Sequence, residues 1–246
     1  MPITFHQLTD FVNGGPAYYE RRHISQSIKL DLRNKLRRAR MRRLAICQPD
    51  AFTSIPAVPG EHLTPSGELS TKAATRTWMD SLPTWDFVSP NELAEFSAIA
   101  NSCDEYRPLV ELICDQDVHF ELGTSKDMGG LTVEASAHIA VPDSIHNFHF
   151  TREFNSAVAQ IRDLFQVERL VWASEVFGNP VGSIFAVETI EPYRVRQYRF
   201  HPAILEAAGE RVARWTASLV RQMDVGRWPA HLPPKLLEPS HLKGAK

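Results

Sequence analysis

The chain has 246 residues, of which 43% are hydrophobic and 23% charged, and its formal net charge is −2 at pH 7. This composition supports one sizeable hydrophobic core without covalent cross-links. A near-neutral net charge excludes a global attraction to polyanions, so any nucleic-acid binding must depend on a local basic patch.

The sequence also predicts the cellular location of the protein and the state of its cysteines. It contains no run of 18 or more apolar residues and no basic, apolar leader, so we expect neither a membrane span nor a secretory signal, and a cytoplasmic location. The three cysteines, Cys47, Cys103 and Cys114, have no C-x-x-C spacing and are odd in number. We therefore expect them to be buried and reduced rather than part of a disulfide framework.

The N-terminal part is predicted to be mainly helical. Residues 3–22 indicate a short helix, a break at Gly14-Gly15-Pro16 and a second helix that begins at the proline. Residues 30–46 predict a basic helix, because their apolar positions recur near helical spacing and acids are absent between Asp31 and Asp50. Its basic side chains either contact phosphate, which we favour, or form a solvated face: Arg33, Lys35, Arg37, Arg38, Arg40, Arg42 and Arg43.

Three scaffold helices are expected next. Residues 53–69 are rich in Pro, Gly, Ser and Thr and predict a surface loop. Helices then follow at 70–82, at 89–100 with Ser89 and Glu92 as a capping box, and at 106–114.

The second half alternates strands with helices. Residues 117–122 predict a strand and 123–130 a turn. Alternating apolar residues predict strands at 131–140 and 145–150, joined by a turn at Pro142-Asp143-Ser144. The period then becomes helical over 152–177, as one helix or two, before strands at 182–190 and 193–200 and a helix at 202–225.

This strand, turn, strand, helix order resembles the core of the PD-(D/E)XK nucleases, and the flanking motifs resemble the phage and prophage RecE (exonuclease VIII) branch. The motifs are CQPDAF at 47–52, IFAVETIEPYRVRQY at 184–198 and GRWP at 226–229. The resemblance implies an α/β fold with a central mixed β-sheet flanked by helices. It also implies one domain over 1–246, with a mainly helical part at 1–115 and the core sheet and helices at 116–230.

Every position that matches the metal site of this family is substituted. The family has an Asp where this chain has His138, and its Asp-Leu-Lys matches Asn147-Phe148-His149. Its metal-site histidine aligns with Arg43, and its helical Gln with Arg169. Two imidazoles and an amide are a poor set for Mg²⁺, which prefers hard oxygen ligands, so no metal site and no cofactor are expected.

Three hypotheses follow for this cluster. The first is a catalytically impaired exonuclease homologue that binds DNA, with phosphate contacts from Arg37, Arg38, Arg40, Arg42, Arg43, His138 and His149. The second is an active exonuclease using Mg²⁺ or Mn²⁺ whose ligands have moved to Glu121, Glu134, Glu153 or Glu168. The third is a protein-interaction scaffold without DNA binding.

Two further expectations concern the histidines and the partners. We expect His138 and His149 to gain protons near the reference pKa of about 6.5, so that phosphate binding strengthens from pH 8 to pH 6. A zinc site shared by His146 and His149 is disfavoured, because these two residues point to opposite faces of a strand and could share a metal only if the strand were broken. The resemblance further implies a homo-oligomer and a single-strand annealing protein as partner in phage or prophage recombination.

Overall fold

The computed structural model describes residues 3–19, 41–43, 56–82, 87–128 and 131–225, without the side chains of 13–19 and of 224 and 225. Arg37, Arg38 and Arg40, Cys47 and the motif at 226–229 therefore lie outside the described residues.

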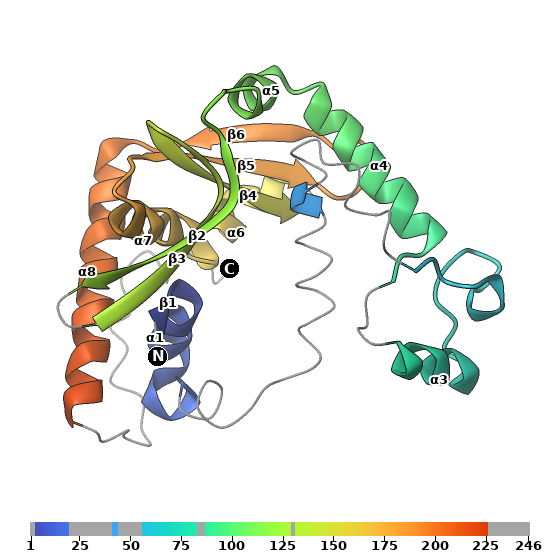
Figure 1. Cartoon of the computed structure of the whole chain (residues 1–246), viewed down its shortest axis with the longest axis horizontal. Coiled ribbons are helices and arrows are strands. Elements are labelled where there is room, and N and C mark those ends of the chain that lie inside the picture. The colour runs from blue at the N-terminus through green and yellow to red at the C-terminus, as the bar shows by residue number, and fades with distance from the viewer. Residues whose placement is uncertain (1–2, 20–40, 44–55, 83–86, 129–130, 226–246) are drawn as a thin grey trace, which may run out of the picture.

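Helices predominate among the described residues of the N-terminal part (Figure 1). After the short strand β1 come a helix, a 3-10 turn and three further helices: β1 (Ile3–Thr4), α1 (Phe5–Tyr19), the 3-10 turn (Gly60–His62), α3 (Ala73–Ser81), α4 (Pro90–Asp104) and α5 (Arg107–Ile113). Helix α4 begins at the predicted capping box, in which the Ser89 side chain accepts from the Glu92 N–H and the Glu92 carboxylate accepts from the Ser89 N–H.

The core unit follows the predicted order of strand, turn, strand and helix. Its elements are β2 (His119–Met128), β3 (Leu131–Val141), β4 (Ser144–Thr151), α6 (Phe154–Asp163), α7 (Gln166–Phe177), β5 (Val181–Glu188), β6 (Val195–Arg199) and α8 (Pro202–Val225). The stretch predicted as one helix or two is two helices, because Phe165 adopts a left-handed φ of 52° between α6 and α7.

The sheet is mixed, with the order β1-β3-β4-β5-β6 and with β2 paired along the other edge of β3. The β1–β3 and β4–β5 pairs are parallel and the others antiparallel. Helices α1, α7 and α8 pack one face in a cluster around Trp172, and α4 and α5 pack the other around Phe96 and Phe185 (Figure 1). A central mixed sheet flanked by helices is the predicted fold class, which is confirmed.

Three local predictions are wrong. Helix α1 continues through Gly14, Gly15 and Pro16, because its first turns bury Phe5, Leu8 and Phe11 in the core and this packing outweighs local propensity. Residues 123–128 extend β2 instead of forming a turn, since their backbone pairs with β3 as far as Met128↔Leu131 although their side chains are polar. Cys114 is exposed, whereas Cys103 is buried as expected.

In both strands of the β2–β3 hairpin, the regular alternation of side chains between the two faces of the sheet is interrupted at one position. Phe120 and Ile139, which pair, pack in the cluster around Phe185, whereas the next pair, Leu122 and Ala137, packs in the cluster around Trp172. Residues two apart in a regular strand share a face, so the alternation is broken between these pairs. The break falls at Glu121, whose φ is 48°, and at His138, the residue opposite it in register.

Candidate functional site

The candidate site lies where β3 and β4 separate. Their pairing covers only Ile139–Val141 and 144–146, while β1 pairs with Val133 and Glu134 farther along the same edge of β3. The edge of β3 between these two partners, residues 135–138, has no strand beside it among the described residues. This separation places the two matched strand positions, His138 and Asn147, next to each other.

The side chains of His138 and Asn147 replace the missing strand pairing. His138 donates its backbone N–H to the Asn147 Oδ1 at 3.1 Å, and its Nδ1 accepts the backbone N–H of Phe148 at 2.8 Å. Both residues are buried, His138 at 5% exposure and Asn147 at 1%. The Asn147 Oδ1 and the His138 Nδ1 are thus engaged with the backbone.

His138 is held neutral. Burial lowers its pKa well below the ordinary value, and the nearby charges of Arg169 and Arg42 lower it further. Protonation at Nδ1 would also cost the bond from the Phe148 N–H. The expected protonation of His138 near pH 6.5 is therefore wrong.

His149 points to α6, where its Nε2 lies 3.1 Å from the Gln160 Oε1. Burial lowers its pKa from 6.5, and the hydrogen bond to Gln160 offsets this only in part. The pKa of His149 therefore lies below the reference value on which the expected protonation depends. Within the described part of the chain, the Asn147 Nδ2 is a buried donor that has no hydrogen-bond partner.

His146 forms hydrogen bonds with a different element from His149. Its Nδ1 accepts the Ser183 backbone N–H from β5 at 3.1 Å, and its Nε2 lies 2.8 Å from the Ser144 Oγ. Burial, together with the charge of Arg199, lowers the pKa of His146 to about 4. Since His146 and His149 bond to β5 and α6 respectively, their geometry does not support a shared zinc ion.

Two arginines lie beside the break in β3. Arg42 is 19% exposed and forms a forked ion pair with Glu121, and the Arg169 Nη2 lies 3.5 Å from the Ser136 Oγ. Their contacts with Glu121 and Ser136 place both guanidinium groups near His138, and their charges lower its pKa. Arg43, the position matched to the family histidine, is exposed, and it is the neighbouring Arg42 whose contacts reach this break.

The carboxylates that could rebuild a metal site do not converge. Glu121 pairs with Arg42, Glu134 and Glu153 are exposed on β3 and before α6, and the buried Glu168 pairs with Arg211 of α8 at 2.8 Å. Among the described residues, no group of three His, Cys, Asp or Glu side chains could hold a metal ion. The donor set of this site therefore does not fit Mg²⁺.

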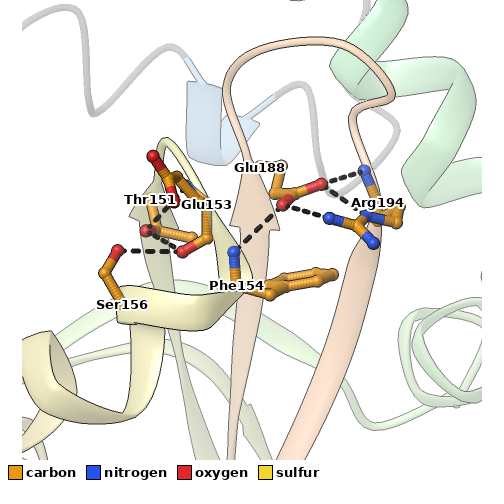
Figure 2. A network of polar contacts seen from close by, with 6 residues as sticks. All are labelled: Thr151, Glu153, Phe154, Ser156, Glu188 and Arg194. Carbon is orange, nitrogen blue, oxygen red and sulfur yellow. Dashed lines mark hydrogen bonds and ion pairs between the residues drawn. The ribbon is translucent and has the colours of Figure 1, made fainter.

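A second polar cluster lies at the carboxyl ends of β4 and β5 (Figure 2). Glu188, 2% exposed, accepts the Phe154 N–H at 3.0 Å and a fork from Arg194 at 2.7 and 2.8 Å. Hydrogen bonds from Arg194 hold the pKa of Glu188 below its usual value. Both oxygens of Glu188 are engaged, so this carboxylate is a structural clamp rather than an open ligand.

The sequence did not predict the ion pairs formed by Glu188 and by Arg42. Glu188 stands in the matched motif at 184–198, but the spacing indicated no role for it, and Arg42 and Glu121 are 79 positions apart. The positive φ of Glu121 has no sequence signal, because a glutamate gives no reason to expect a left-handed backbone.

Comparison with known proteins supports the fold. No protein-family model matches the chain, and no curated protein matches it. A crystal structure of a "putative exonuclease" from Eubacterium rectale superposes on 100% of this chain and 94% of its own, with a TM-score of 0.58 and 11% identity. A second solved structure covers 50% of this chain and 67% of its own, at 12% identity and a TM-score of 0.27, which carries no argument.

At 11% identity the first similarity establishes the fold alone. The protein has the fold of that structure, an α/β fold with a central mixed sheet, and its site differs from a carboxylate metal centre over the residues that the structure describes. None of the described helices is both long enough and apolar enough to cross a membrane.

Proposed function

We propose that this protein binds DNA at the separation of β3 and β4 and does not cleave it by a metal-dependent route. The observation that carries the proposal is the pair of arginines, Arg42 and Arg169, beside a neutral His138 in a nuclease-like sheet. Guanidinium groups bind phosphate through fixed positive charge and parallel N–H donors. Metal-assisted hydrolysis, in contrast, needs hard oxygen ligands that converge.

The proposed phosphate contact differs in its pH dependence from the contact that the sequence predicts. His138 and His149 have lowered pKa values, so the positive charge comes from arginines, which stay protonated. DNA affinity is therefore expected to be unaffected by a chelator and nearly constant between pH 8 and pH 6. Fluorescence anisotropy with a labelled duplex, with and without EDTA, measures both quantities.

We also propose a family and a biological role for this protein. The matched motifs support a RecE-type exonuclease homologue that has lost activity and acts in phage or prophage recombination, as a DNA-end binder or a non-catalytic subunit. A homo-oligomer and a single-strand annealing partner rest on the resemblance alone. Arg43 and the arginines before residue 41 remain proposed phosphate contacts.

The first test is a nuclease assay on linear duplex DNA with Mg²⁺ or Mn²⁺, run beside a binding assay on the same DNA. We expect binding without degradation. Degradation that is abolished in Glu134→Ala or Glu153→Ala would instead establish an active site with displaced ligands. Restoring one family residue, as in His138→Asp, should not produce activity, because Asn147 and His149 remain unsuited to the metal.

The second test removes the two arginines. Arg42→Ala with Arg169→Ala should weaken DNA binding roughly tenfold or more, and it should lower the salt slope by about one unit for each phosphate that the arginines neutralise. Arg107→Ala with Arg214→Ala is the matched control, because these exposed arginines lie on α5 and α8, each in an i,i+4 pair with a glutamate. An equal effect of both double variants would contradict the proposed location.

A further inference from the structure

Arg42 already holds an anion in the structure, the carboxylate of Glu121. The Arg42 Nε lies 2.6 Å from the Glu121 Oε1, and its second donor, Nη2, lies 3.3 Å from Oε2. Two oxygens facing two parallel N–H donors is also the geometry in which guanidinium binds phosphate. The Glu121 carboxylate thus fills the donor fork that a DNA phosphate would use.

The backbone at Glu121 is unusual for a glutamate in a strand. Its φ of 48° lies in the left-handed region, which is strained for a residue other than glycine. Regular β2–β3 pairing continues on both sides, at Phe120↔Ile139 and at Leu122↔Ala137. The strained residue is therefore confined to the position opposite His138, beside the proposed phosphate contact.

The ion pair is weak enough to be exchanged. Glu121 is 37% exposed and Arg42 is 19% exposed, so water reaches both partners. Exposed ion pairs contribute little to stability, because solvent screens their attraction. A phosphate brought close by further contacts along a DNA backbone can displace such a carboxylate.

We propose that Glu121 is an internal competitor for DNA phosphate: its carboxylate occupies the donor fork of Arg42, and a backbone phosphate takes its place when DNA binds. This inference rests on the proposed function. It predicts that the acid at position 121 weakens DNA binding and lowers the salt dependence of the wild-type protein, because part of the Arg42 charge is already neutralised.

The test compares Glu121→Gln with Glu111→Gln by anisotropy with a labelled duplex. The two substitutions change the net charge equally, and Glu111 pairs with Arg107 on α5 at 2.7 Å, in an exposed pair on another element. We expect Glu121→Gln to bind DNA roughly three- to tenfold more tightly than Glu111→Gln, with a salt slope steeper by up to about one unit. Arg42→Ala in the same chain should abolish this difference.

Glu121→Gly guards against a folding effect, because glycine tolerates the positive φ and removes the carboxylate. This variant should also bind more tightly than Glu111→Gln. Equal affinity of the position-121 variants and Glu111→Gln would overturn the inference, as would weaker binding, which would make Glu121 a positioning residue for Arg42. If DNA binds and Arg42→Ala weakens it, the proposed function stands even then. Absence of salt-dependent DNA binding in every variant would refute both.

Discussion

Gly182 shows how a single residue supports the geometry of β4. A Cβ atom at this position would lie 2.6 Å from the His146 Nδ1, so the imidazole ring would have to move. That movement would break the bond from the Ser183 N–H to the His146 Nδ1. We expect Gly182→Ala to lower the free energy of unfolding by about 2 kcal/mol, because it overpacks the core and breaks a buried hydrogen bond.

Urea unfolding of Gly182→Ala measures this change. Gly60→Ala is the control, because nothing lies within 4 Å of a Cβ built at Gly60. A loss of similar size in both variants would mean that the contact with the His146 ring does not explain the effect.

His146 also makes stability depend on pH. Its folded pKa is about 4, against about 6.5 in an unfolded chain, so between these values the unfolded state binds the proton and the folded state does not. The free energy of unfolding should therefore fall as pH decreases from about 6.5 to about 4, by on the order of 3 kcal/mol, and be unaffected above that range. Buried His138 contributes in the same direction.

Unfolding by urea at several pH values tests this expectation. His146→Gln should reduce the loss of stability between pH 7 and pH 4.5, whatever its effect at pH 7. His201→Gln, at an exposed position before α8, should keep the wild-type slope. If His146→Gln leaves the slope unchanged, His146 takes up a proton in the folded protein as readily as in the unfolded one.

At the scale of elements, Glu188 joins the end of β5 to the start of α6 and to the residue before β6 (Figure 2). Glu188→Gln would turn an amide toward the Arg194 donors and remove the charge that strengthens their hydrogen bonds. We expect it to lower the free energy of unfolding by about 1 kcal/mol, because the buried Glu188 position loses charge-assisted hydrogen bonds while Arg194, 56% exposed, stays hydrated. Thermal unfolding measures the change. Glu153→Gln, an exposed acid next to the same helix start, should stay within about 0.5 kcal/mol of wild type.

The sequence predicts elements best where burial imposes a period. The β3–β4 hairpin and the helical period of α6 and α7 are visible because one face of each is apolar. Strand β2 beyond Leu122 cannot be recognised in the sequence, because its polar side chains show no alternation and only the pairing with β3 makes it a strand. Helix α1 is misread for the opposite reason, since its local Gly-Gly-Pro signal is weaker than the packing of its first turns.

Of the residues predicted for the candidate site, the structure brings His138 and Asn147 together, but the sequence did not predict their bonding. Motif spacing places His138 beside Asn147, and the structure brings these residues together. Their bonds to backbone N–H groups depend on the separation of β3 from β4, which no residue pattern specifies. For the same reason the pKa values of His138 and His149 could not be anticipated, because burial by distant elements determines them.

At the scale of the whole molecule, a net charge of −2 means that DNA binding must come from a local patch. The basic segment at residues 30–46 is the patch that we propose. Its described end at Met41 is buried in the cluster with Phe148 and Phe185, so this end is fixed to the sheet. Replacing Arg37, Arg38, Arg40 and Arg42 together by Ala should weaken binding about equally for all DNA sequences, because phosphate contacts carry no sequence information. The salt slope should fall by up to about four units, one for each phosphate neutralised.

The control for this quadruple variant removes the same charge elsewhere, through Arg76→Ala, Arg107→Ala, Arg162→Ala and Arg214→Ala at exposed positions. It should keep the wild-type salt slope, since the slope reports the counterions that phosphate contacts release and not net charge alone. An affinity for DNA that is equal in the two quadruple variants would assign the basic segment to a solvated face. A partner bound with no salt dependence would point instead to an apolar protein interface, and hence to the scaffold hypothesis.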